Sequence, residues 1–358
     1  MRRLAAAISL AFLASAGWAE TIRVASFDTE LSRDGPGLLL RDIERGQDAQ
    51  IAAVIEVIAR VAPDILALQG IDWDHDGQAL SALAHRLAER GAAYPHRFAT
   101  RPNAGIETGL DLDGDGRTGG PGDAQGYGRF TGDGGMAVLS RFPMGEVRDF
   151  SALLWRDLPG AALPVWPDGA PFPSAEAQAV QRLAEQGFWI VPVDLPEGGR
   201  LSLLTFRAAP PVFDGPEDRN GLRNHDEILF WRHYLDGAFG PAPEGRFVIA
   251  GNANLDPFDG EGRHEAIRAL LNDQRVQDPA PRSPGATTAA DQGHQGPNAL
   301  DTADWPRAGR LRVDYVLPSA DWQVAGAGVY WPEPGAPGYE AAQTASRHRL
   351  VWVDLILP

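Results

Sequence analysis

The stretch from Arg246 to Pro257 constrains the fold of this chain more than any other. Within it, Phe247 to Ala250 is a short apolar, β-branched run that predicts a buried strand. The run stops at Gly251, and Asn252 and Asn254 follow at a spacing that puts both amides on one face of an extended segment. An Asx-rich turn that closes the strand is one interpretation. Ligands of layered α/β folds bind at such carboxyl ends of strands, so the pair is also a candidate site.

Apolar runs of strand length and amphipathic segments of helix length share the rest of the chain. Strands are predicted at 21–27, 64–69, 96–100, 136–140, 188–195, 201–206, 311–317, 322–330 and 349–357. Helices are predicted at 47–61, 78–90, 262–271 and 224–235, the last opened by Asn224 as N-cap with Glu227 three residues later. This mixture predicts one α/β domain of the α+β kind, with two mixed or antiparallel sheets flanked by helices.

The first 19 residues have the pattern of a secretory signal peptide. Arg2 and Arg3 precede an apolar run that ends at Ala16, and Ala19 offers a small residue for cleavage. We therefore expect a domain over residues 20–358 in a periplasmic or secreted protein. No other segment is long and apolar enough to span a bilayer, so no membrane partner is expected. The chain has no cysteine, which excludes disulfides and thiolate metal sites.

The charge of the chain limits its partners. The formal net charge is −16, and no run of Lys and Arg is present to follow a phosphate backbone. Tight binding of nucleic acid is therefore not expected. A small phosphorylated or anionic ligand remains possible, because it needs only a locally positive pocket.

Six motifs follow one another along the chain, each at a predicted strand end. They are Arg-Val-Ala-Ser-Phe-Asp at 23–28, Asp-Ile-Leu-Ala-Leu-Gln-Gly at 64–70, Gly-Met-Ala-Val-Leu-Ser-Arg-Phe-Pro at 135–143, Gly-Asn-Ala-Asn-Leu-Asp-Pro at 251–257, Arg-Val-Asp-Tyr-Val-Leu at 312–317 and Ser-Arg-His at 346–348. In this order they resemble the endonuclease/exonuclease/phosphatase family, the DNase I-like metal-dependent phosphoesterases. The segment 210–220 looks like a secreted bacterial branch of that family.

The resemblance covers the chain after residue 19 and implies a four-layer sandwich. It also implies hydrolysis of a phosphoester, in which carboxylates hold Mg²⁺ and a carboxylate–histidine pair activates water. Three positions carry the residues that the family uses there. Asn254 matches the phosphate donor, Asp314 matches the residue that orients the final histidine, and His348 matches that histidine.

Five other positions depart from the family. Asp28 replaces an asparagine, Gly70 a metal-binding glutamate, Arg207 a histidine, Asn252 the aspartate that orients water, and Arg347 a metal-associated aspartate. Losing one such group can cost several kcal/mol of transition-state stabilisation. The resemblance therefore predicts an impaired or lost hydrolase site.

The two arginines suggest what such a site could do instead. Arg207 and Arg347 are expected to converge on the position of the family's metal, where Asp28 is available as a partner. Together with Asn252, Asn254 and His348 they would form a binding site for a small anion or phosphate ester, because guanidinium forks match such oxygens. The alternative is that the arginines only neutralise leftover carboxylates.

A second hypothesis keeps the chain active as a phosphodiesterase or phosphatase. It uses a rearranged Mg²⁺-dependent site with Asp28, Asp314 and His348, and Asp72 and Asp74 are available as substitute carboxylates. Both are also typical of solvated loops.

A further motif lies in the glycine-rich segment 101–134. Asp111, Asp113 and Asp115 alternate and are followed by Gly116, as at the start of an EF-hand calcium loop. Gly122 stands where that loop has its bidentate glutamate. A calcium site and a solvated Asp/Gly turn are both compatible with this pattern.

Overall fold

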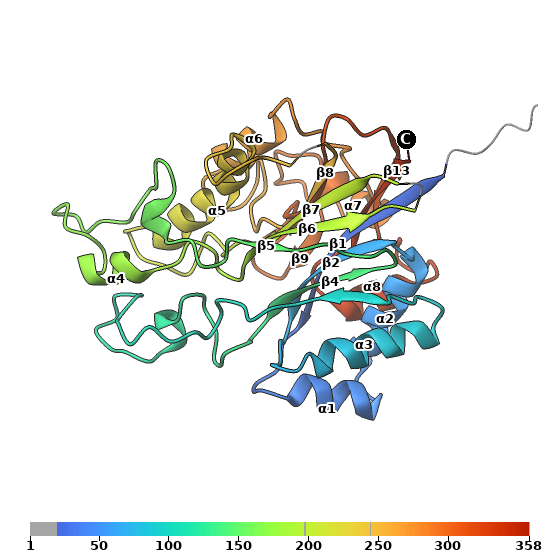
Figure 1. The fold of residues 1–358 in the computed structure, drawn as a ribbon, viewed down its shortest axis with the longest axis horizontal. Coiled ribbons are helices and arrows are strands. Elements are labelled where there is room, and N and C mark those ends of the chain that lie inside the picture. The colour runs from blue at the N-terminus through green and yellow to red at the C-terminus, as the bar shows by residue number, and fades with distance from the viewer. Residues whose placement is uncertain (1–19, 197, 244, 358) are drawn as a thin grey trace, which may run out of the picture.

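The chain forms a sandwich of two β-sheets with helices on both outer faces (Figure 1). In this computed structural model, residues 20–196, 198–243 and 245–357 are described, and the predicted signal peptide at 1–19 lies outside them. The prediction of two mixed sheets flanked by helices is confirmed. In the described ranges, no helix has both the length and the apolar character needed to cross a membrane.

The first sheet has six strands in the order β12-β13-β1-β2-β4-β3. Strands β1 and β2 are parallel, and the other neighbours are antiparallel. The bounds are β1 Thr21–Leu31, β2 Ile65–Ile71, β3 His96–Phe98, β4 Gly135–Ser140, β12 Val324–Val329 and β13 Val351–Ile356.

The second sheet has five strands in the order β11-β8-β7-β6-β5, and only β7 and β8 are parallel. A separate two-stranded ribbon joins β9 and β10. The bounds are β5 Arg148–Asp149, β6 Phe188–Asp194, β7 Arg200–Arg207, β8 Phe247–Asn252, β9 Ala303–Trp305, β10 Gly309–Leu311 and β11 Asp314–Pro318.

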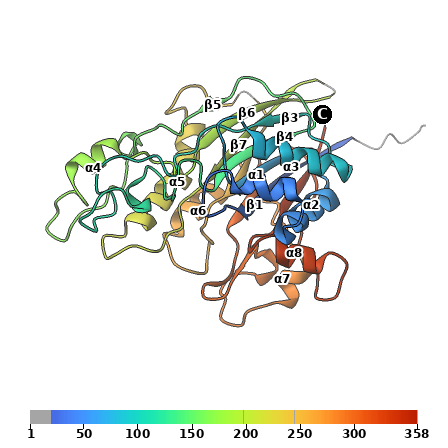
Figure 2. The same ribbon diagram turned by 90° about the horizontal axis from the view of Figure 1, so that it is seen from below.

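Helices cover the outer face of each sheet. Helices α1, α2, α3 and α8 lie on the first sheet, and α5 and α6 on the second (Figures 1 and 2). The bounds are α1 Leu38–Arg45, α2 Ala49–Val61, α3 Gln78–Glu89, α4 Ala175–Val180, α5 Arg219–Leu235, α6 Glu265–Leu271, α7 Pro284–Thr288 and α8 Tyr339–Ala345, with 3₁₀ turns at Pro121–Asp123, Trp155–Asp157 and Asn298–Leu300.

Alternation along the strands builds three apolar layers between these four layers of structure. In β8, Val248 and Ala250 face the core between the sheets, whereas Phe247 and Ile249 face α5 and α6. All four are buried, which explains why the sequence shows a continuous apolar run there. The four-layer prediction thus follows from strands that are covered on both faces.

Two sequence predictions need correction. Helix α5 begins at Arg219, five residues before the predicted N-cap Asn224. Asn224 is buried within the helix, and its amide donates to the carbonyls of Ala209 and Ala253, so it ties α5 to the ends of β7 and β8. The predicted strand at 311–317 is broken, because Leu311 pairs with Ala303 in the small ribbon and β11 starts only at Asp314.

Two long excursions project together from one end of the sandwich. They cover residues 101–134 and 151–187 and lie side by side in both views (Figures 1 and 2). Asn103 joins them, since its backbone N–H donates to Gln186 and its amide donates to the carbonyls of Ser151 and Ala184.

Candidate active site

Strand ends from both sheets bring five of the predicted site residues together. Asp28 lies near the end of β1, and Arg207 and Asn252 end β7 and β8 in direct register. Asp314 opens β11 opposite Asn252, and His348 stands shortly before β13. Because β1 packs against β8 across the sandwich, these side chains meet at one edge.

Asp28 is the buried centre of this group. Its Oδ2 atom accepts hydrogen bonds from Arg207 Nε at 2.7 Å and from Asn252 Nδ2 at 2.8 Å. Burial alone would raise the pKa of Asp28, but the charges of Arg207 and His348 and these two hydrogen bonds hold it below its usual value. Asp28 is therefore an ionised carboxylate that is already bonded from the opposite sheet.

Arg207 has the position expected from the sequence and pairs with Asp28 as suggested there. Its side chain is 25% exposed. Burial works against its charge, but the carboxylate of Asp28 raises the pKa of Arg207, so the guanidinium stays charged. Within the described part of the chain, Nη1 and Nη2 of Arg207 have no hydrogen-bond partner. Arg207 thus keeps free donors beside Asp28.

Arg347 pairs with Glu30 instead of Asp28. Its backbone N–H donates to Glu30 Oε2 and its Nε to Oε1, each at 2.8 Å, and Nη2 also contacts Oε1. Burial would raise the pKa of Glu30, but the hydrogen bonds and charge of its partners lower it. Glu30 was missed by the sequence analysis. The backbone of Glu30 is left-handed, with a φ of 50°, so its side chain leaves the alternation of β1. In the sequence, the one indication of this residue was a carboxylate two positions after Asp28.

Gly70 leaves no room for the glutamate that the family has at this position. Its φ is 67°, and a Cβ atom built there would lie 2.4 Å from Asp28 Oδ1 and 2.9 Å from the backbone nitrogen of Glu30. Any side chain would be strained in this backbone and would collide with Asp28.

His348 and Asp314 form the contact that the resemblance implied. His348 Nδ1 lies 2.9 Å from Asp314 Oδ2, and the Thr302 hydroxyl donates to the same oxygen at 2.9 Å. Burial alone would lower the pKa of His348, but the charges of Asp314 and Asp28 raise it to about 9. Burial raises the pKa of Asp314, whereas the charge of His348 and the hydrogen bonds from His348 and Thr302 favour the charged form of this carboxyl group. We treat the pair as an imidazolium and a carboxylate.

Asn252 and Asn254 use most of their side-chain polar atoms in hydrogen bonds within the protein. Asn252 Oδ1 accepts the backbone N–H of Asn254 at 2.6 Å, which is the Asx turn that the sequence allowed. Asn254 has a φ of 49°, and its Nδ2 donates to the carbonyl of Ala208 at 2.8 Å. One N–H of the Asn254 amide remains for a ligand, because Nδ2 carries two.

Asp72 and Asp74 hold loops in place. The two oxygens of Asp72 accept the backbone N–H groups of Gly134 and Arg33. Asp74 accepts those of Gln78 and Ala79 at the start of α3. Since backbone bonds hold both side chains, we assign neither a role in the candidate site.

The Mg²⁺ ion that the resemblance implied does not fit these residues. Mg²⁺ requires oxygen ligands in near-octahedral geometry and usually binds through one or two carboxylates and several waters. Here Asp28 Oδ2 is bonded to Arg207 and Asn252, both oxygens of Glu30 are bonded to Arg347, and Gly70 offers no ligand. We therefore derive no chemical step that involves this ion.

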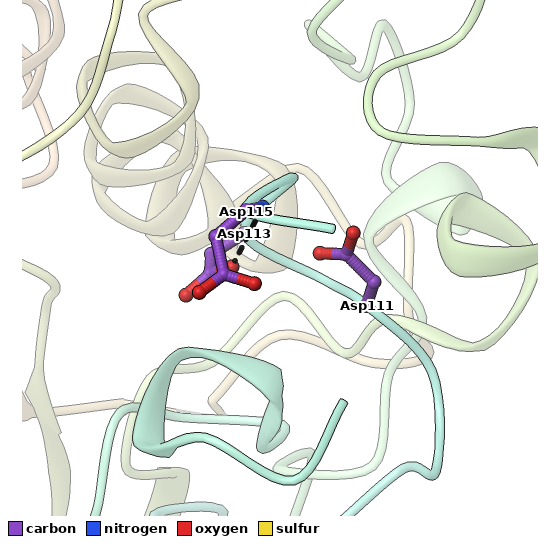
Figure 3. A group of neighbouring side chains, drawn as sticks. All are labelled: Asp111, Asp113 and Asp115. Carbon is purple, nitrogen blue, oxygen red and sulfur yellow. Dashed lines mark hydrogen bonds between the residues drawn. The ribbon is translucent and has the colours of Figure 1, made fainter. Parts of the chain in front are cut away.

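The predicted acidic triad lies together in the first excursion (Figure 3). Asp111, Asp113 and Asp115 each offer a carboxylate oxygen, and these atoms lie within 4.8 Å of one another, so the triad could hold a metal ion. The two oxygens of Asp111 accept the backbone N–H groups of Gly114 and Gly116. Burial and the neighbouring carboxylates raise the pKa of Asp113, as expected for crowded negative charges.

The fold and the strand-end site define a phosphoesterase-like protein. Residues 42–348 match the endonuclease/exonuclease/phosphatase family, and the chain belongs to it. None of the curated proteins matches the sequence.

Solved structures share the fold at low sequence identity. An endonuclease/exonuclease/phosphatase from Beutenbergia cavernae has a TM-score of 0.54 and 19% identity, covering 94% of this chain and 72% of that one. A family protein from Leptotrichia buccalis has a TM-score of 0.52 and 14% identity, covering 94% and 100%. One from Bacteroides thetaiotaomicron has a TM-score of 0.51 and 13% identity, covering 95% and 99%. At these identities the comparison describes the fold alone.

Proposed function

We propose that this chain binds a small phosphate-bearing or similarly anionic ligand at the common end of β1, β7 and β8, and that its hydrolase chemistry is impaired. The observation that supports this proposal is the set of free donors on Arg207. Asp28 fixes the guanidinium through Nε, while both terminal nitrogens have no hydrogen-bond partner in the described residues. A guanidinium held in this way presents a planar pair of donors to a phosphate oxygen pair.

His348 and Asn254 supply further donors around the same edge. With a pKa of about 9, His348 is protonated near neutral pH, and its Nε2 makes no hydrogen bond within the described ranges. The cations Arg207, Arg347 and His348 balance the carboxylates Asp28, Glu30 and Asp314 without a metal ion. Because these charges already balance, an anion would be held by the free N–H donors of Arg207 and His348 and not by a net positive charge.

Asn252 supports the proposal that hydrolysis is impaired. At this position the family orients water with an aspartate, whereas here the amide donates to Asp28 and accepts from Asn254. A neutral amide cannot take a proton from water, so no general base stands there.

Calorimetric titration with inorganic phosphate and phenyl phosphate tests this proposal. We expect binding that persists in EDTA and weakens at least about tenfold in Arg207→Gln, the loss of about one charge-assisted hydrogen bond. Arg41→Gln, which removes an exposed arginine from α1, is the control and is expected to bind like the natural protein. Equal binding by both variants would refute the assignment of Arg207.

An active phosphodiesterase or phosphatase remains the second candidate, because the His348–Asp314–Thr302 chain of contacts is intact. Hydrolysis of bis-p-nitrophenyl phosphate with Mg²⁺, Mn²⁺ or Ca²⁺ separates the two. We expect none. Metal-dependent turnover that disappears in His348→Ala would establish the second candidate instead.

We also propose that the triad of Asp111, Asp113 and Asp115 binds Ca²⁺. Ca²⁺ accepts six to eight oxygens in irregular geometry, and alternate carboxylates in a glycine-containing loop suit it. What supports this is the approach of the three carboxylates to within 4.8 Å.

Finally, we propose that the chain is exported to the periplasm or medium and does not bind nucleic acid tightly. The supporting features are the pattern of residues 1–19 and the net charge of −16. Mass spectrometry of protein made in a bacterial host with an export pathway should find an N-terminus at Glu20. Material that still begins at Met1 would argue against export.

A further inference from the structure

Arg219 is a buried cation without a counter-ion. It is the first residue of α5 and is 8% exposed. Its Nε is buried without a partner, and its single hydrogen bond is a long one, 3.4 Å from Nη1 to Asn220 Oδ1. In the described residues no carboxylate lies within ion-pair distance of it. Arg223, one turn later, instead pairs with Glu185 at 2.6 Å and donates to several carbonyls.

A buried charge without a partner is costly, so its presence needs an explanation. Burial and the positive charge of Arg223 lower the pKa of Arg219 to about 10, which leaves it charged at neutral pH. The acidic groups that act on it from a distance are Glu185, Asp113 and Asp214, and all three lie outside the helices and strands. Nη2 has no partner in the described segments and is not among the fully buried atoms. An anion could therefore complete its hydrogen bonds.

The position of Arg219 favours an anion over another ligand. Side chains in a helix tilt toward its N-terminus, so Arg219 extends toward the positive end of the 17-residue α5. The preceding residue Asp218 does not cap the helix with its side chain and pairs with Arg263. At the helix start, Asp214 already accepts the backbone N–H of Asn220, so an anion would be held by the unpaired guanidinium of Arg219 and not by that N–H group.

A chain of hydrogen bonds connects this position to the site of Arg207. Arg223 binds Glu185, and the backbone N–H of Glu185 donates to Glu227 Oε1 at 2.6 Å. The other oxygen of Glu227 accepts the N–H of Ala209, two residues after Arg207, at 2.7 Å. The negative charge of Glu185 acts on both Arg207 and Arg219. The hydrogen-bonded chain through Glu185 and Glu227 thus joins the segments that carry the two arginines.

We infer that Arg219, at the start of α5, forms a second anion subsite, so that the ligand of the proposed site carries two anionic groups, one at Arg207 and one at Arg219. This inference rests on the proposed function. It names the ligand class as a bisphosphate, or a phosphate ester with a second phosphate or carboxylate.

The test compares methylphosphonate with α,ω-alkane bisphosphonates of increasing chain length by calorimetric titration. In the natural protein we expect one chain length to bind at least about tenfold tighter than methylphosphonate, which corresponds to about 1.4 kcal/mol. Arg219→Gln should abolish this gain and leave the affinity for methylphosphonate within about twofold. Arg219→Lys should keep part of the gain, because the charge is retained.

Arg232→Gln is the matched control, since Arg232 lies on the same helix near its other end and is 41% exposed. It should bind like the natural protein. If methylphosphonate binds but no chain length improves affinity, the subsite is wrong while the proposed function stands. If neither probe binds, both are wrong. A gain that survives equally in Arg219→Gln, with its folding verified by circular dichroism, would also overturn the subsite.

Discussion

At the scale of single residues, the Arg207–Asp28 pair is the point where the two sheets depend on each other. Asp28 is fully buried, and Arg207 donates to it from the other sheet. Arg207→Gln leaves the carboxylate buried without its cation. We expect the free energy of unfolding to fall by about 3 kcal/mol, as when one partner of a buried ion pair is removed. Urea denaturation measures this change.

The double variant Asp28→Asn/Arg207→Gln separates charge from packing. With both charges removed, no uncompensated carboxylate remains, and most of the lost stability should return. A double variant as unstable as Arg207→Gln alone would mean that shape, and not charge, sets the cost.

His348 makes a pH-dependent contribution to stability. Its pKa rises from 6.5 to about 9 on folding, so the folded state holds its proton more tightly than the unfolded chain. The resulting stabilisation is complete below pH 6.5 and is lost as the pH rises through about 9. Anion binding should weaken over the upper part of this range. NMR titration of the His348 ring checks the pKa, and Asp314→Asn should move it downward. An unchanged value in that variant would contradict the imidazolium–carboxylate pair.

The sequence alone predicted the meeting of Asp28 with Arg207 but not the partner of Arg347. Strand ends are read from apolar runs, so residues at those ends can be placed. Glu30 comes just after such an end, and its positive φ depends on the approach of Gly70 and on hydrogen bonds from a segment more than 300 residues away. No local pattern encodes that geometry.

At the scale of elements, helix α5 shows how tertiary contacts override local signals. Asn224 has the sequence pattern of an N-cap, yet the helix starts at Arg219. The amide of Asn224 does not cap the helix and instead donates to the backbone carbonyls of Ala209 and Ala253. The same shift places Arg219 at the helix start, in a stretch where no helix was predicted from the sequence.

The loop of Asp111, Asp113 and Asp115 should respond to calcium as a unit. Ca²⁺ at millimolar concentration is expected to raise the melting temperature of the natural protein by several degrees, since binding to the folded state alone stabilises it by mass action. EDTA should reverse the shift, and Mg²⁺ should act more weakly because it prefers rigid octahedral sites.

Asp113→Ala should abolish that calcium response, whereas Asp76→Asn, at an exposed loop carboxylate, should retain it. Differential scanning fluorimetry measures all three proteins. Identical calcium shifts in the natural protein and in Asp113→Ala would show that the triad is an ordinary solvated turn.

At the scale of the whole molecule, the sandwich could be predicted because the strands are continuous apolar runs in the order of one family. The two excursions could not be predicted in the same way. They are rich in glycine, proline and polar residues, and their paths depend on distant contacts such as those of Asn103 with Ser151 and Ala184. The paths of these excursions were therefore the least predictable part of the fold.

The distribution of the site over both sheets leads to a final prediction, that a metal site can be rebuilt without touching Gly70. Glutamate at Gly70 would collide with Asp28, but Glu30 already provides a carboxylate that, among the described residues, only Arg347 and Ser346 engage. The triple variant Arg207→His/Asn252→Asp/Arg347→Asp frees Glu30 and Asp28 and adds two carboxylates. Four acidic groups would then lie at one edge, an arrangement that hard cations favour.

We expect this variant to bind Mn²⁺ in calorimetric titration and to lose affinity for inorganic phosphate. In the absence of Ca²⁺, the natural protein should bind inorganic phosphate and should not bind Mn²⁺. The triple variant also carrying Glu30→Gln is the matched control and should bind Mn²⁺ at least about tenfold more weakly, because one ligand is removed. Asp113→Ala is included in every protein so that the triad contributes nothing. Equal Mn²⁺ binding by the natural and triple-variant sites would mean that the arginines do not exclude the metal, and that the ion pairs of Arg207 and Arg347 open readily in solution.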